Sequence, residues 1–248
     1  MKQLFFIVLS LNVMAQAPNI VEVTEWTAKN QALMIDILND YADSDSEVTG
    51  VSSFVLEVID GNKVYYCRGF ESMQDLLDSR MKRWGEDGTN SKVMNLMREK
   101  RSEDDMNWAS TGPKKIMSHV FRLNQNLSYV PKGVDLKSEL PKLTFRRHII
   151  MDVHEGPGNM EKFRSQIRSG IENDIKLKNN YIRLMFTPIY GGVNNGDFMM
   201  IVMDKSRSDY YNGLAERNKK RDKDSDWKKI QSENVASWIQ EEDIKIHY

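Results

Sequence analysis

The sequence contains a single cysteine, Cys67, so no disulfide can form within the chain and the fold must be held by its core. An excess of either charge is also missing, because 35 basic and 36 acidic residues give a formal net charge of −1. A nucleic acid or an anionic membrane selects for a basic surface, so neither is expected as a partner. The run around Cys67, VYYCRGF, is apolar, which favours a buried small residue over a nucleophile.

Long apolar segments are missing too, except at the amino terminus. MKQLFFIVLSLNVMAQ has one positive charge at Lys2, an apolar stretch over residues 4–11, and small Ala15 just before Gln16. This is the layout of a secretory signal, and the stretch is too short to span a bilayer. We therefore predict that residues 1–15 are cleaved before Gln16 and that the protein is secreted or periplasmic, with no membrane association afterwards. A buried first strand or helix is the alternative.

The chain does contain an internal similarity. IDGNKVYY (59–66) predicts a strand, a tight turn and a strand, because Asp-Gly is a strong hairpin signal; GGVNNGDFMM (191–200) predicts the same through Asn-Gly. After each hairpin, a Ser-x-x-Asp pattern beginning at Ser72 or at Ser206 predicts a capped helix start. The two patterns lie 134 positions apart, which indicates two similar halves.

Each half predicts the element order β-α-β-β-α-β, which is a ferredoxin-like unit. The first strands are expected at 19–26 and 144–153, each followed by a helix with an apolar stripe, and the final strands at 115–123 and 243–248. The segment between the halves carries prolines and glycine without clear periodicity. The domain assignment that follows is a first unit at 16–123, a linker at 124–142 and a second unit at 143–248.

This order resembles the dimeric α+β barrel superfamily in its tandem, single-chain form. The resemblance implies an α+β fold in which two tandem ferredoxin-like units pack sheet to sheet as a pseudo-dimeric barrel. The superfamily includes antibiotic-biosynthesis-type and haem-degrading monooxygenases. In its haem-degrading members an asparagine, a tryptophan and a helical histidine act together. Because none of the four histidines here is predicted on a helix, haem is not expected, and no other cofactor is implied.

Alternation along the strand at 144–153 puts Arg146, His148 and Asp152 on one face, opposite a mostly apolar face. Alternation along 243–248 likewise separates Lys245 and His247 from isoleucines. First and last strands are neighbours in a ferredoxin-like sheet, so we expect these five side chains to point together into the space between the sheets. They would form either an internal ion-pair network or the lining of a binding cavity. No metal site is predicted, because an obvious third ligand is missing.

His119 and Trp108 are the candidates in the first half. His119 alternates with apolar Met117 and Phe121, which fits either a core histidine or one that lines a pocket under the helices. Trp108 is expected to seal helix against sheet, with gripping of a flat ligand as the alternative. The repeat of NWAS (107–110) as NVAS (234–237) aligns His119 with Ile246, so His247 is not its counterpart.

No catalytic motif appears in these patterns. The favoured interpretation is a secreted or periplasmic protein that binds a small molecule without catalysis. One alternative is a cofactor-independent, monooxygenase-like enzyme with a pocket between helices and sheet, and a further alternative is a structural or interaction module. Whether the protein is an enzyme, and its oligomeric state, stay open at this point.

Overall fold

The computed structural model describes residues 17–85, 87–190, 196–224 and 234–247. The secretory signal predicted at residues 1–15 and its cleavage site lie outside the described residues. Among the helices of the described part, none is long and apolar enough to cross a membrane.

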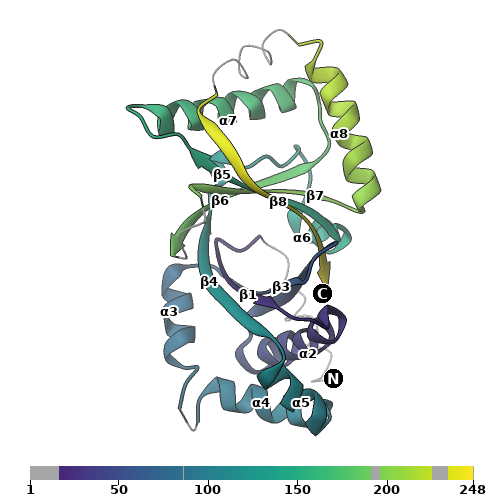
Figure 1. The fold of residues 1–248 in the computed structure, drawn as a ribbon. Helices are drawn as coiled ribbons and strands as arrows, with labels where there is room; N and C mark the ends of the chain where they lie inside the picture. The colour runs from purple at the N-terminus through teal and green to yellow at the C-terminus, as the bar shows by residue number, and fades with distance from the viewer. Residues whose placement is uncertain (1–16, 86, 191–195, 225–233, 248) are drawn as a thin grey trace, which may run out of the picture.

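The described residues contribute eight strands to one closed antiparallel barrel, in the order β1-β3-β2-β8-β5-β7-β6-β4 (Figure 1). The strands are β1 (Ile20–Thr27), β2 (Ser52–Val58), β3 (Lys63–Phe70), β4 (Lys114–Leu123), β5 (Phe145–Val153), β6 (Ile182–Tyr190), β7 (Phe198–Asp204) and β8 (Ala236–His247). The four strands before residue 124 therefore form one half of the barrel, and the four after residue 144 form the other. The halves are hydrogen-bonded to each other through β2–β8 and β4–β6, so the predicted α+β barrel is confirmed as one closed sheet.

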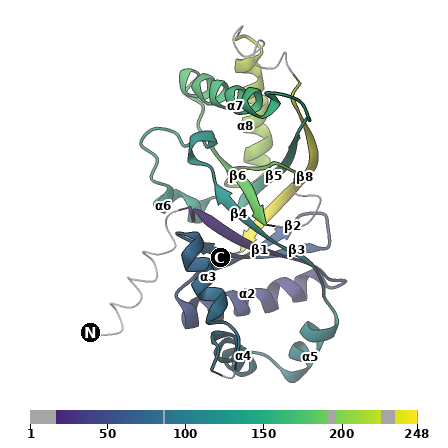
Figure 2. The same cartoon turned by 90° about the vertical axis from the view of Figure 1, so that its left-hand side faces the viewer.

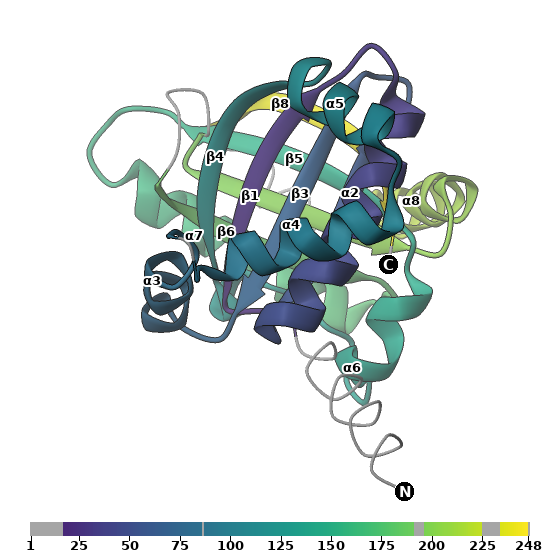
Figure 3. The same cartoon turned by 90° about the horizontal axis from the view of Figure 1, so that it is seen from below.

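Two groups of helices cover opposite sides of the barrel (Figures 1 and 3). The first group lies over β1, β3 and β2 and comprises α2 (Gln31–Thr49), α3 (Met73–Met81), α4 (Thr89–Lys100) and α5 (Glu103–Thr111). The second comprises α7 (Asn159–Lys176) and α8 (Arg207–Arg221). The chain between β4 and β5 forms η1 (Gln125–Leu127), α6 (Leu136–Glu139) and η2 (Leu140–Lys142), with α6 to one side of the barrel (Figure 2).

Local sequence signals explain where several elements begin. Asp60 adopts the left-handed conformation in the turn between β2 and β3, as the Asp-Gly hairpin signal requires. Ser72 caps α3 by accepting a hydrogen bond from the backbone N–H of Asp75, and Ser206 caps α8 by accepting one from Asp209. Both predicted caps are confirmed.

The strands divide their side chains between two apolar environments. On the outer face of β5, Ile149 and Met151 pack with Phe163 of α7, as the alternation predicted. The inner faces form a separate cluster that includes Val21, Cys67 and Ile244, into which Leu140 and Leu143 of the connecting segment also pack. The expected burial of Cys67 is thus confirmed, and its place is the barrel interior.

The last strand differs most from expectation. It begins at Ala236 instead of residue 243, so NVAS does not match the helical NWAS of α5. Ile239 has no partner across the β5–β8 ladder, where Ile150 is opposite Gln240 and Met151 is opposite Trp238. This extra residue is a β-bulge, which shifts the alternation of the strand and cannot be located from spacing alone.

Candidate functional site

A cavity of about 720 Å³ lies inside the barrel. Each strand contributes to its wall, and most of the contributed side chains are apolar, among them Val23, Phe54, Leu184, Phe186 and Met199. Pockets of this size and composition hold small organic ligands, since apolar walls supply burial and a few polar groups set orientation.

One end of the cavity is polar and centres on Glu242 of β8. Tyr65 donates a hydrogen bond of 2.6 Å to Glu242 Oε2, while Lys63 and Gln240 donate to Oε1 at 3.0 and 2.7 Å. Burial and the neighbouring Glu242 carboxylate raise the pKa of the Tyr65 phenol far above its ordinary value. Tyr65 therefore stays protonated and holds the carboxylate in place.

Glu25 and His119 form the second polar pair at this end. Glu25 Oε2 lies 3.9 Å from His119 Nε2, and Glu25 Oε1 lies 3.5 Å from Lys63 Nζ. The nearby His119 imidazole and the Lys63 charge hold the pKa of Glu25 below its usual value, against the effect of burial. Glu25 is therefore a carboxylate, and its negative charge faces the His119 imidazole.

Arg146 and His148 line the cavity from β5, and each is 8% exposed. The Arg146 guanidinium carbon lies 5.8 Å from the centre of the Phe54 ring, a cation–π arrangement. Burial, together with the Arg146 charge, lowers the pKa of His148 to about 3. His148 is therefore neutral at physiological pH and offers hydrogen bonds rather than charge.

The structure brings three of the predicted site residues together. His119, Arg146 and His148 all line the cavity. His119 lies inside the barrel and not under the helices. The alternation of its strand had left both positions open. The predicted inward direction of Arg146 and His148 is confirmed.

Lys245, His247 and Asp152 do not reach the cavity, so their expected place in it was wrong. At the end of β8, Ile244 and Ile246 face inward and Asp243 faces outward, where it accepts hydrogen bonds of 2.7 Å from Arg147 and from Arg207. His247 lies beyond the β5 pairing, and its Nε2 is 2.8 Å from Glu57 Oε2 on β2. The prediction placed the face of Asp243, Lys245 and His247 inside, but Ile244 and Ile246 occupy the inner face at these positions. Asp152 is exposed near the end of β5.

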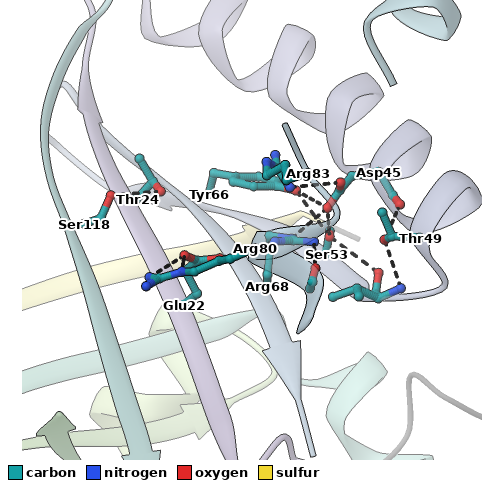
Figure 4. A network of polar contacts seen from close by, with 12 residues as sticks. Glu22, Thr24, Asp45, Thr49, Ser53, Tyr66, Arg68, Arg80, Arg83 and Ser118 are labelled. Atoms are coloured by element: carbon teal, nitrogen blue, oxygen red, sulfur yellow. Dashed lines mark hydrogen bonds and ion pairs between the residues drawn. The ribbon is translucent and has the colours of Figure 1, made fainter. Parts of the chain in front are cut away.

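Trp108 lies outside the barrel, partly buried on α5 among the side chains beneath α2 and α4. The enzyme alternative placed a pocket in this region, but a closed polar network fills part of it (Figure 4). Fully buried Asp45 accepts hydrogen bonds from Tyr66 at 2.7 Å, Arg68 at 2.9 Å and Ser53 at 3.0 Å, and pairs with Arg83 at 3.3 Å. Asp45 has no exposed surface and its four contacts are all to protein groups, so this network is structural.

The sequence analysis missed Glu25, Lys63, Tyr65, Gln240 and Glu242. Val21, Val23 and Glu25 occupy every second position of the first strand. This spacing puts Glu25 on the same inner face as the two valines. No comparable signal was available for Gln240 and Glu242, because their strand had not been recognised.

The residues present do not match a histidine-bound haem of the helical type. His119, His148 and His247 lie on strands and His154 follows β5, so none of the four histidines is on a helix. No group of three or more potential metal-ligating His, Cys, Asp or Glu side chains occurs among the described residues.

Comparison with known proteins supports the fold. No family model and no curated protein sequence matches the chain. Among solved structures, an anthrone oxidase-like protein superposes with a TM-score of 0.56 at 10% identity, over 94% of both chains. A putative monooxygenase from Fusobacterium nucleatum gives 0.53 at 12%, over 93% of both chains. A putative monooxygenase from Lactobacillus acidophilus gives 0.51 at 12%, over 93% of this chain and 94% of that one.

These neighbours correct the favoured interpretation of a binding protein without catalysis. The similar structures carry the names of monooxygenases, of an anthrone oxidase-like protein and of a chlorite dismutase, which fit the enzyme alternative better. The chain therefore shares the α+β barrel fold of these solved structures.

Proposed function

We propose that the protein is a cofactor-independent, monooxygenase-like enzyme that acts on a small, mostly apolar molecule inside the barrel. The observation that carries this proposal is the cavity of about 720 Å³, whose apolar wall ends at a histidine–carboxylate pair. This cavity differs in place from the pocket that the enzyme alternative put between helices and sheet.

His119 is the proposed general base, and Glu25 is its positioning residue. An aromatic ketone with an acidic methylene, of which anthrone is an example, loses a proton from that methylene to the base. The resulting carbanion can pass electrons to O₂. One oxygen atom then becomes the new carbonyl and the other leaves as water, so the two C–H bonds supply all the electrons and no external reductant is needed.

The surrounding groups assist this step. The Glu25 carboxylate favours the protonated imidazole that forms, and the apolar wall keeps water away from the carbanion. At the same polar end of the cavity, hydrogen bonds from Tyr65 and Lys63 hold the Glu242 side chain in place. Because these groups are already fixed, the surroundings of the base do not have to reorganise during proton transfer.

The test is oxygen uptake with anthrone as the substrate. The expected result is consumption of one O₂ per anthraquinone formed, at a rate above the buffer background. His119→Gln should lower kcat by about 100-fold or more, the usual effect of removing a general base. His247→Gln is the matched control, because this histidine lies on the outer face and should leave the rate unchanged. A rate equal to background, or equal rates for wild type and His119→Gln, would contradict the proposal.

We also propose that the barrel consists of two tandem ferredoxin-like units, at 16–123 and 143–248, joined by a linker at 124–142. The strand orders β4-β1-β3-β2 and β8-β5-β7-β6 support this division, since each is the order of a ferredoxin-like sheet. A second support is that each half buries an aspartate late in its first helix, Asp45 in α2 and Asp174 in α7. The proposed localisation is secreted or periplasmic, because residues 1–15 carry the pattern of a secretory signal.

A further inference from the structure

The ammonium group of Lys63 stands between two carboxylates at the polar end of the cavity. Its Nζ atom donates a hydrogen bond of 3.0 Å to Glu242 Oε1 and lies 3.5 Å from Glu25 Oε1. The carboxylates come from different halves of the barrel, Glu25 from β1 and Glu242 from β8, and each side chain is only 13% exposed. One cation is therefore shared by two partly buried anions.

This arrangement keeps the ammonium and Glu25 charged. Burial acts to lower the pKa of Lys63, but the hydrogen bond to Glu242 and the charges of both carboxylates raise that pKa overall. The His119 side chain and Lys63 hold the pKa of Glu25 below its usual value, although burial acts to raise it. Without Lys63, two carboxylates would share a partly buried space with no cation between them, and the cluster would bind a proton more readily.

His119 is the basic group beside this cluster. Its Nε2 atom lies 3.9 Å from Glu25 Oε2, and the other oxygen of the same carboxylate contacts Lys63. Lys63 therefore cancels one of the two negative charges near the imidazole. A second carboxylate that is not offset would favour the imidazolium, which has no lone pair left to accept a proton from a substrate.

The cavity wall carries further titratable or charged groups: Tyr65 and Cys67 from β3, and Arg146 and His148 from β5. Tyr65 and Cys67 stay protonated, because burial raises the pKa of both thiol and phenol, that of Cys67 to about 12. His148 is neutral, because burial and the Arg146 charge lower its pKa to about 3. Arg146 is opposite Ile244 in the β5–β8 ladder, deeper in the barrel than Glu242, so Lys63 is the nearer cation.

We propose that Lys63 is a positioning residue for the base: by offsetting Glu242, it leaves the single negative charge of Glu25 to act on His119. This inference rests on the proposed function, because it concerns the same base. It also gives a role to a contact between the halves of the barrel, since Lys63 belongs to the first half and Glu242 to the second.

The test follows the His119 imidazole directly and needs no turnover. Protein labelled with ¹³C at the histidine Cε1 position is titrated by NMR between about pH 5 and pH 9, and the His119 signal is identified by its loss in His119→Gln. Lys63→Met removes the cation, Lys63→Arg keeps it, and Glu242→Gln removes the carboxylate that it offsets. The double variant Lys63→Met/Glu242→Gln removes both charges, and the melting temperature of every variant is recorded.

The expected result is a pair of opposite shifts. Lys63→Met should move the midpoint of the His119 titration to higher pH by about one unit, the effect of one charge acting over several ångströms in a partly buried site. Glu242→Gln should move the midpoint to lower pH by a similar amount. The double variant should return it close to the wild-type value, and Lys63→Arg should leave it there.

The same shifts should appear in catalysis. The acid limb of the pH profile of kcat for oxygen uptake with anthrone should move to higher pH in Lys63→Met, while KM stays within about twofold of wild type. Lys245→Met is the matched control, because it removes the same charge from an exposed position of β8 and should shift neither profile.

Two results would overturn the inference. One is a folded Lys63→Met protein whose His119 signal titrates at the wild-type pH, and the other is an equal shift in Lys63→Arg, which keeps the charge. If Lys63→Met does not fold, Glu242→Gln decides through the presence or absence of its downward shift. The titration is independent of turnover, so absence of oxygen uptake contradicts only the proposed function, and an unshifted titration with normal oxygen uptake contradicts only this inference.

Discussion

His119 and Glu242 stand at matching positions of the two strands β4 and β8. Each lies three residues after an unpaired bulge residue, Ile116 in β4 and Ile239 in β8, and both side chains line the cavity. The alignment of NWAS with NVAS, which paired His119 with Ile246, was therefore wrong by four positions. The two bulges put a histidine from one half of the barrel and a carboxylate from the other at the same polar end.

Protonation of His148 should make the protein acid-sensitive. Its pKa is about 3 in the folded protein and about 6.5 in the unfolded chain. Between these values the unfolded chain binds a proton that the folded protein does not, so the free energy of unfolding falls as pH falls through this window. Between pH 7 and pH 5, wild type should lose about 2 kcal/mol more than His148→Phe. Urea denaturation at both pH values measures this, and an identical pH dependence in the two proteins would show that His148 titrates normally.

Removal of the Asp45 carboxylate should destabilise the protein strongly. Asp45→Asn removes the carboxylate that pairs with the largely buried Arg83 and leaves the buried Arg68 with Glu22 as its remaining counter-ion, and loss of one partner of a buried pair costs about 3–5 kcal/mol. Chemical denaturation measures the change. The matched control is Asp43→Asn, because Asp43 is exposed on the same helix and its substitution should cost less than about 0.5 kcal/mol. Equal effects of the two substitutions would contradict the structural role of the network.

The outward residues of β8 should not affect the proposed oxidation of anthrone. Lys245→Met and His247→Phe are expected to consume oxygen with anthrone at rates within about twofold of wild type, since neither side chain lines the cavity. The sequence analysis placed both residues in the site, so this measurement separates that prediction from the observed register. A tenfold loss in either variant would favour the earlier prediction.

The proposed secretory signal has a direct test. Expression of the full chain in a bacterium with an intact export pathway should yield a periplasmic or extracellular protein. Its mass, measured by mass spectrometry, should match a chain that begins at Gln16. A substitution of Ala15 by a bulky residue should slow this processing, because signal peptidases require a small residue there. An uncleaved chain that accumulates in the cytoplasm would contradict the proposal.

Much of the fold was predictable because its signals are local. The hairpin between β2 and β3 and the caps at Ser72 and Ser206 each depend on residues a few positions apart. The outer face of β5 was predictable for a similar reason, since its alternation is unbroken over nine residues. The site was predictable only in part: Arg146 and His148 follow from that alternation, whereas Glu242 belongs to a strand that was not recognised.

The sequence by itself determined most of the helices and strands, since capping, turn formation and apolar periodicity act between near neighbours. Only the tertiary structure decided that β2 pairs with β8 and β4 with β6, and so that the polar residues enclose one cavity. It also decided the face of β8, where Asp243 is held outside by Arg147 and Arg207. Strand pairing and bulge position depend on contacts between residues far apart in the chain, and local spacing carries no information about those contacts.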